Sequence, residues 1–284
     1  MSKKPTSSRI REVVFGILSF FLSLLFTMFS FSLVIGSTVL NKNAWIDSMN
    51  RCGYFNDKTT EVRDKLRDLT YASGLKEDFF DGVVDEIMVT EDTYNYIEGY
   101  FEGTTTVVDG TAFRQKISVA LDDYIKETGQ KASAEQVSEL VKQAEHVYTA
   151  TVSFVGIGAI SVYFLAAKKA LPFVLAGIII LALGLIAVLF FCNKWKHRAM
   201  KFYYYATAGA FLANFALALF MTVNKGAKNI NLEYRSVYNF VVSFVNSVNV
   251  MFWICTALFL LLSVALFFVY RRLFYKASKK KGSS

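Results

Sequence analysis

The sequence is poor in the residues that interrupt helices or build chemical sites. Its 284 residues include only two prolines, three cysteines and two histidines. With so few prolines, long helices can run without a break. Cys52 is the only cysteine between Asn41 and Ala150. A small domain held together by disulfides is therefore excluded for that segment.

Acidic residues are almost absent outside one segment. Between Asn41 and Ala150 there are 12 Lys and Arg against 21 Asp and Glu, a net charge of −9. The rest of the chain holds 19 basic and two acidic residues, a net charge of +17. An acidic module between basic, apolar segments is typical of a membrane protein. Nucleic-acid binding would need the basic residues gathered on one folded surface, so the net charge of +8 does not predict it.

Four stretches lack any charge over a length that can cross a bilayer, which takes about 20 apolar residues. They are residues 13–40, 171–192, 202–223 and 251–270. The first is too long for the apolar part of a cleaved signal peptide, so we expect a retained anchor. In the third, Ala206 and Ala210 repeat at four-residue spacing, as do Gly209 and Ala213. Small residues at this spacing let helix backbones approach closely in lipid.

Lys and Arg cluster beside these stretches in three places, namely the N-terminus 1–12, the loop 193–201 and the tail 271–284. Because such clusters stay in the cytoplasm, four spans with both termini inside the cell place all three correctly. Segments 41–150 and 224–250 then lie outside the cytoplasm. The sequence thus predicts an all-α protein of the cell membrane, with four transmembrane helices and a mainly helical extracytoplasmic domain between helices 1 and 2.

The apolar segment 151–170 is compatible with two interpretations. As a fifth span over 151–167, it would put the basic loop and the basic tail on opposite sides of the membrane. We favour an apolar continuation of one long helix that runs from Ala134 to about Lys169 and lies at the outer leaflet. Ser133 with Gln136 forms the pattern of a capping box that starts such a helix. Pro172 would then suit the first turn of the next helix.

Segment 41–150 carries helix patterns and few strand patterns. Helix ends are signalled by Gly74, Gly103 and Gly129, and helix starts by Thr90 and Ser133. Only Thr104–Val108 looks strand-like. In 224–250, apolar residues from Leu232 to Val248 share one face and predict an amphipathic helix, either at the membrane interface or packed under the domain.

No pattern in the sequence indicates a catalytic, cofactor-binding or metal-binding site. The predicted topology puts His146 and His197 on opposite sides of the membrane, so they cannot share a metal. A serine hydrolase needs a histidine base, and His146 is the sole external histidine; no GxSxG is present. A phosphate-binding glycine loop is also lacking. We therefore predict no enzyme and no cofactor.

The carboxylates of the acidic segment are numerous but not spaced as a calcium loop of the EF-hand kind. They include Asp81, Asp85, Glu86, Asp122 and Asp123. A solvated helix face is the simpler interpretation, and a weak cation site is the alternative. The four spans contain no Asp, Glu, Lys, Arg or His, which disfavours an ion-coupled transporter. Asn214 in the third span is predicted to form a hydrogen bond between helices.

Two sequence segments carry a resemblance. LRDLTYASGLKEDFF (Leu66–Phe80) and the basic loop NKWKHR (Asn193–Arg198) resemble uncharacterised four-span integral membrane proteins of Gram-positive bacteria with one exported helical domain. Claudin-like proteins are similar in their large first outer loop, but this chain lacks their paired cysteines and tryptophan motif. Permeases of cell-division and macrolide-export ABC systems look similar in topology. Their helix before the first span, which engages an ATPase, is barely accommodated by Met1–Glu12.

These observations together predict a multi-pass membrane protein whose extracytoplasmic domain binds a partner protein, peptide or envelope component without catalysis. The alternative is a permease-like or accessory subunit of an ABC-type transport or mechanotransmission complex. The expected partners are the lipid bilayer and either a protein at the outer domain or a second copy of the chain. The alternative adds a cytoplasmic ATPase, and no nucleic acid is expected.

Overall fold

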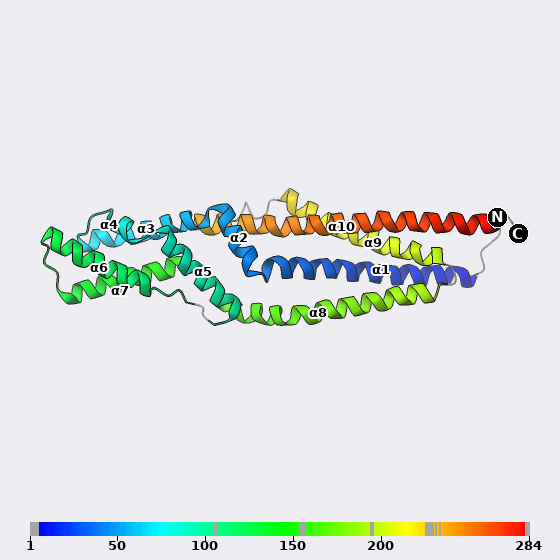
Figure 1. Ribbon diagram of the computed structural model, residues 1–284, viewed down its shortest axis with the longest axis horizontal. Helices are drawn as coiled ribbons and strands as arrows, with labels where there is room; N and C mark the ends of the chain where they lie inside the picture. The colour runs from blue at the N-terminus through cyan, green and yellow to red at the C-terminus, as the bar shows by residue number, and fades with distance from the viewer. Residues whose placement is uncertain are drawn as a thin grey trace. The chain divides into compact units, whose positions relative to one another are not determined.

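A computed structural model describes residues 6–104, 107–153, 157–193, 196–224, 230, 232 and 234–281. Over these residues the chain is almost entirely helical and contains no strand (Figure 1). It divides into two compact units. The span unit comprises Met1–Val39, Lys168–Gly226 and Asn246–Ser284; the acidic unit comprises Leu40–Ala167 and Ala227–Val245. The acidic unit holds every Asp and Glu of the chain except Glu12.

Four helices are long and apolar enough to cross a membrane, as the sequence predicts. Their candidate spans are Ile10–Val39, Tyr163–Phe191, Lys196–Asn224 and Arg235–Lys279. They belong to α1 (Thr6–Val34) with a π-helical turn at Ile35–Val39, α8 (Ile157–Phe191), α9 (Lys196–Asn224) and α10 (Arg235–Lys281). The starts of α1 and α9 and the ends of α8 and α10 lie together at one end of the span unit (Figure 1).

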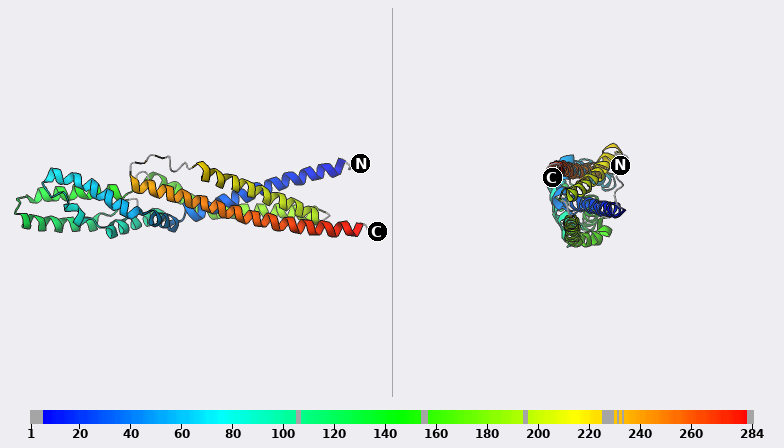
Figure 2. Two further views of the ribbon diagram at one scale, coloured as in Figure 1. Left: turned by 90° about the horizontal axis from the view of Figure 1, so that it is seen from above. Right: turned by 90° about the vertical axis from the view of Figure 1, so that its right-hand side faces the viewer.

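Within the span unit, α1 and α9 lie side by side (Figure 2). The small residues Ala206 and Ala210 are fully buried in this contact, and Gly209 lies against the side chain of Ser23. The predicted close approach of a small-residue face is therefore confirmed. Asn214 Nδ2 donates to Ser30 Oγ at 3.1 Å, which confirms the predicted hydrogen bond between helices.

The acidic unit is built from shorter, amphipathic helices. They are α2 (Lys42–Cys52), α3 (Tyr54–Ser73), α4 (Phe79–Val83), α5 (Glu86–Glu102), α6 (Thr111–Thr128) and α7 (Ala134–Val152). Val62 and Leu66 of α3, Ile117 of α6 and Ala144 of α7 have no exposed surface and belong to the core. Burial of these apolar faces is the main force that holds the helices together.

Local end signals of the helices were predicted well. Gly74, Gly103 and Gly129 follow α3, α5 and α6 with φ of 71°, 74° and 66°, a left-handed conformation that favours glycine. Ser133 and Gln136 form the predicted capping box at the start of α7. The start predicted at Thr90 is wrong, because α5 begins at Glu86 and its N-cap is Asp85, whose Oδ1 accepts from Met88 N at 2.8 Å. Thr104, Val107 and Val108 form no strand; Thr105 and Thr106 lie outside the described residues.

The single long helix expected from Ala134 to about Lys169 is not found. Helix α7 ends at Val152, and Ser153 is extended with φ −68° and ψ 149°. Helix α8 begins at Ile157 and continues through Pro172 to Phe191, so the apolar segment belongs to the helix of the second span. Phe164 of this segment is buried, with its ring centroid 4.8 Å from that of Phe101. Residues 154–156 lie outside the described residues.

Two further details of the membrane segments differ from expectation. Pro172 lies inside α8 rather than in a first turn, a placement that spanning helices tolerate. The helix predicted within 224–250 is present, but it is the beginning of α10 and runs without a break into the fourth span. Phe240 of this segment is buried, with its ring 6.2 Å from that of Tyr54. Packing within the acidic unit is thus the correct interpretation for this helix start.

Candidate functional site

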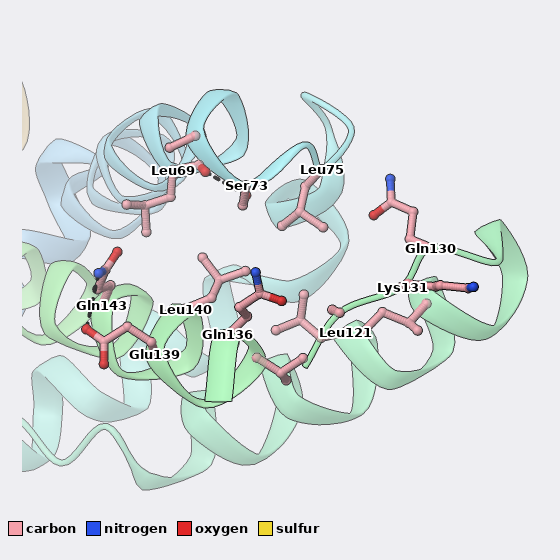
Figure 3. Close-up of a pocket in the computed structure, with 14 residues that line it drawn as sticks. Leu69, Ser73, Leu75, Leu121, Gln130, Lys131, Gln136, Glu139, Leu140 and Gln143 are labelled. Atoms are coloured by element: carbon pink, nitrogen blue, oxygen red, sulfur yellow. Dashed lines mark hydrogen bonds between the residues drawn. The ribbon is translucent and has the colours of Figure 1, made fainter. Parts of the chain in front are cut away.

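A cleft of about 400 Å³ opens in the acidic unit between α3, α6 and α7. It lies where α3 ends and α7 begins, and residues of the two connecting turns complete it (Figure 3). The turns have this course because Gly74 and Gly129 end α3 and α6 in the left-handed conformation and the Ser133 capping box starts α7. The volume is that of a small ligand pocket.

The floor of the cleft is apolar. Its aliphatic side chains are Leu69, Leu75, Leu121, Ile125, Val137 and Leu140. Leu121 is buried, whereas the other five are half-buried and keep surface open to the cleft. Leu69, Leu75 and Leu140 point toward its middle (Figure 3). Covering this surface would remove apolar area from water, which is favourable at roughly 25 cal/mol per Å².

The rim of the cleft carries amides and two opposite charges. Gln143 Nε2 donates to Glu139 Oε1 at 3.2 Å, and Gln130 Nε2 donates to the Gly74 carbonyl at 3.3 Å. Lys131 stands at the open edge (Figure 3). Amide side chains both donate and accept, so this rim can pair with the backbone amides of an extended or helical peptide.

The cleft has no arrangement for covalent catalysis in the residues that line it. Among the lining residues, Ser73 is the one with a hydroxyl group. Its Oγ donates to the Leu69 carbonyl at 2.7 Å within the same helix. His146, which the sequence offers as the only base of this unit, is exposed on α7 and is not among the lining residues. The residues that line the cleft therefore bring no nucleophile together with a histidine base.

A second constellation joins α3 to the first turn of α10 by a shared carboxylate. Glu61 Oε1 accepts from the backbone N–H of Ser236, and Glu61 Oε2 accepts from Ser236 Oγ, each at 2.7 Å. Lys58 Nζ lies 3.0 Å from Glu61 Oε2. A carboxylate at a helix N-terminus satisfies an N–H without an intrahelical partner and interacts favourably with the helix dipole.

Asp57 adds a second row of contacts to the same pair of helices. Asn239 Nδ2 donates to Asp57 Oδ2 at 2.7 Å, and Arg235 Nε lies 3.9 Å from that oxygen. We call the whole set the α3–α10 clasp, namely Asp57, Lys58 and Glu61 of α3 with Arg235, Ser236 and Asn239 of α10. The pattern of 224–250 predicts the amphipathic helix but not these partners on α3.

Lys58 is the most unusual residue of the clasp because only 1% of it is exposed. Its amine lies over two aromatic rings, 5.6 Å from the centroid of Tyr54 and 4.9 Å from that of Tyr234. Burial lowers the pKa of Lys58, and Glu61 opposes this shift. The sequence held one signal for this arrangement, because Lys58 lies four residues from both Tyr54 and Val62 and so falls on the apolar face of α3.

Aromatic rings surround Trp45 in the same unit. Its ring centroid lies 5.5 Å from Phe101 of α5 and 5.6 Å from both Phe240 and Phe244 of α10. Phe164, from the start of α8, lies 6.5 Å away. Edge-to-face contacts of this kind add stability beyond the buried area. Trp45 therefore fixes the starts of α8 and α10 against α2 and α5.

A polar pair of the buried Tyr148 and the half-buried Asp92 fixes α7 against α5. The Tyr148 hydroxyl donates to Asp92 Oδ2, and the Tyr148 ring stacks on Phe113 with centroids 4.3 Å apart. Burial raises the pKa of Asp92, an effect that the hydrogen bond from Tyr148 partly offsets. Burial and the same hydrogen bond raise the pKa of Tyr148. With a satisfied partner on each side, this pair is structural.

The carboxylates considered as a weak cation site do not converge. Asp85 pairs with Lys116 at 2.6 Å and Asp81 with Arg67 at 3.7 Å, while Asp123 lies 3.4 Å from Lys126. Glu86 and Asp122 are exposed. Among the residues that the structure describes, no group of three or more His, Cys, Asp or Glu could hold a metal ion. His197 lies in the first turn of α9, in the span unit.

No protein-family model, curated protein or solved structure matches this chain.

Proposed function

We propose that this chain is a multi-pass protein of the cell membrane whose acidic unit lies outside the cytoplasm and binds a peptide segment of a partner protein, without catalysis of its own. The cleft between α3, α6 and α7 carries this proposal. It offers half-buried leucines as a floor and glutamines as a rim, which is the composition of a binding surface.

The topology in this proposal rests on charge. The basic segments 1–12, 193–201 and 271–284 adjoin the helix ends that lie at one end of the span unit. With these ends in the cytoplasm, the single domain inserted after the first span is exported. An exported domain with one free cysteine, Cys52, and no disulfide is more typical of a bacterial surface than of a eukaryotic one.

The charge of the acidic unit narrows the chemistry of the partner. Its two ranges hold 14 Lys and Arg against 22 Asp and Glu. A negative domain attracts cationic partners over long range and raises their rate of association. We therefore expect a peptide segment that inserts aliphatic side chains into the cleft and carries basic residues beside them.

Site-specific photo-crosslinking in intact cells tests this function. A benzophenone amino acid replaces Ala72, which lines the cleft, and in a control protein it replaces Asn95, which is exposed on α5. We expect one discrete adduct from position 72 that disappears when Leu140→Trp fills the cleft. The same adducts from both positions, or an adduct from position 72 that survives Leu140→Trp, would contradict the proposal.

A second candidate is the permease-like or transmission subunit, which the length of α10 favours. This helix starts in the clasp of the acidic unit and continues as one helix to Lys281 in the basic tail. A rigid helix of this kind suits the transfer of ATPase work from the cytoplasm to an outer domain. This second candidate function predicts that a cytoplasmic ATPase co-purifies with the protein. Replacement of the basic residues of 193–201 should abolish the co-purification. Retention of the ATPase by that variant, or its absence from the wild-type protein, would remove this candidate.

A further inference from the structure

One helix of the acidic unit connects the cleft with the clasp. The last turns of α3 supply Leu69, Ala72 and Ser73 to the cleft, and its first turns supply Asp57, Lys58 and Glu61 to the clasp. Glu61 and Leu69 are eight residues apart, which is about 12 Å along a helix. A straight helix of this length moves as a unit, so a displacement at one end reaches the other.

The clasp has little tolerance for such a displacement. Both hydrogen bonds from Ser236 to Glu61 are 2.7 Å long, and the Lys58–Glu61 pair is at 3.0 Å. Hydrogen bonds weaken steeply once they lengthen beyond about 3.5 Å. Ser236 has no exposed surface, so a displacement of α3 leaves its N–H and its hydroxyl buried without the Glu61 acceptor, which costs about 1–3 kcal/mol for each unsatisfied group. The clasp is therefore an element with two states, closed and open.

We propose that a ligand in the cleft opens the α3–α10 clasp and thereby frees the first turn of α10. The inference rests on the proposed function, because it takes the cleft as the ligand-binding surface. A side chain inserted between Leu69 and Leu140 pushes α3 away from α7 at its cleft end. The clasp then loses the Ser236 contacts, and the start of the longest helix of the chain is released.

The release is confined to the first turn of α10. It removes the carboxylate that satisfies the Ser236 N–H. The next turns stay in place, because Phe240 and Phe244 pack around Trp45 and Ser243 Oγ donates to the Ser48 carbonyl at 3.1 Å.

A covalent probe tests the coupling without knowledge of the natural partner. Ser73→Cys is made in the full-length chain in which Cys52, Cys192 and Cys255 are replaced by Ser, and it is modified with benzyl methanethiosulfonate. Hydrogen exchange of the backbone amides of residues 236–242 is the readout. We expect exchange about tenfold faster after modification, since the first turn opens locally. The matched control carries the same benzyl group on Val119→Cys, which is exposed on α6 away from the cleft, and should leave exchange unchanged.

A second variant keeps the test independent of folding defects. Lys58→Met with Glu61→Leu replaces the buried ion pair by apolar groups of similar size, a change that folded proteins tolerate, and removes the acceptor of the Ser236 N–H. In this background the first turn should exchange fast from the start, and the benzyl group at position 73 should add less than about twofold. Unchanged exchange on modification of Ser73→Cys, or an equal tenfold response in the neutral background, would overturn the proposal. Because the benzyl group stands in for the ligand, this test can fail while photo-crosslinking succeeds, and the reverse.

Discussion

The amine of Lys58 lies 3.0 Å from Glu61 Oε2, one turn further along α3, although the lysine is only 1% exposed. The same carboxylate accepts both hydrogen bonds from Ser236 of α10. A buried ion pair is costly to desolvate and is seldom a large net source of stability. The carboxylate instead fixes the register of α10 against α3, because no other register of α10 offers Glu61 the same partners.

Removal of one partner should therefore cost far more than removal of both. Glu61→Ala leaves the Lys58 amine buried without a counter-charge, and we expect a loss of about 3–5 kcal/mol in the free energy of unfolding. Lys58→Met with Glu61→Gln should lose at most about 1 kcal/mol. Chemical unfolding of the purified protein in detergent measures both. Equal losses in the single and the double variant would show that the charges are not coupled.

The pairing of Asp85 with Lys116 predicts a dependence on pH. The hydrogen bond from Lys116 and that from Met88 N hold the pKa of Asp85 below its usual value of 3.8. The contribution of Asp85 is therefore complete above pH 3.8 and is lost as the pH falls through the lower pKa of the folded state. Asp85→Ala should cost about 1 kcal/mol at neutral pH, as expected for a helix cap, and progressively less in acid.

Thermal unfolding of the wild type, Asp85→Ala and Asp85→Asn across this range checks the expectation. Asn keeps the cap to Met88 N but loses the ion pair, so its melting temperature should lie between the other two at neutral pH. A gap between wild type and Asp85→Ala that stays constant down to the acid limit would contradict the assigned cause.

The stability that Asp92 contributes should depend on pH in the opposite direction to that of Asp85. Burial raises its pKa above 3.8, so the folded state holds the Asp92 proton more firmly than the unfolded state does. Stability from this group rises as the pH falls through the raised pKa and levels off below 3.8. Asp92→Asn resembles the protonated form and can still accept from Tyr148. It should be more stable than the wild type at pH 7 by less than about 1 kcal/mol, since Asp92 is only partly buried. A destabilised Asp92→Asn would contradict this assignment.

The features that were predicted correctly depend on neighbouring residues alone. A charge-free run of lipid length identifies a span by itself, and a glycine in the left-handed conformation ends a helix whatever lies around it. Gly74, Gly103, Gly129 and the Ser133 capping box are of this local kind. The helix start predicted at Thr90 was wrong because a second cap residue, Asp85, lies five positions earlier. Asp85 is also held by an ion pair with Lys116 of another helix.

The features that were missed depend on residues distant in the sequence. Helix α7 ends at Val152, and the apolar segment that follows packs its Phe164 against Tyr100 and Phe101 of α5. The cleft depends on how α3, α6 and α7 meet, and the clasp on Glu61 and Ser236, which are 175 positions apart. No pattern within one helix specifies such contacts, although a lysine on the apolar face of α3 was a usable signal.

The contact between α1 and α9 predicts a selective sensitivity to one added methyl group. A Cβ at Gly209 would collide with Ser23 Oγ and lie 3.2 Å from Ser23 Cβ, whereas a Cβ at Gly177 would meet nothing within 4 Å. We expect Gly209→Ala to destabilise the span unit by about 1–3 kcal/mol, a typical cost of overpacking. Gly177→Ala is the matched control and should be neutral. Ser23→Gly added to Gly209→Ala should recover most of the loss in thermal unfolding; an unrelieved loss would place the defect elsewhere.

Labelling of intact cells tests the proposed orientation, on which the cellular meaning of cleft and clasp depends. Single cysteines replace Asn95, exposed on α5, and Ser278, exposed near the end of α10, in a chain whose own cysteines are changed to Ser. Lys and Arg are retained in the cytoplasm during insertion, so the tail that contains Lys276 and Lys279 should stay inside. A maleimide that cannot cross membranes should label position 95 in intact cells and position 278 only after permeabilisation. In intact cells, labelling of position 95 should exceed that of position 278 at least about tenfold, and permeabilisation should raise the labelling of position 278 by a similar factor.

Because α10 is a single helix between the acidic unit and this tail, the two positions cannot share a side if α10 spans the bilayer. Labelling of position 278 in intact cells would invert the topology and place the cleft in the cytoplasm, where a peptide partner would have to be sought among soluble proteins.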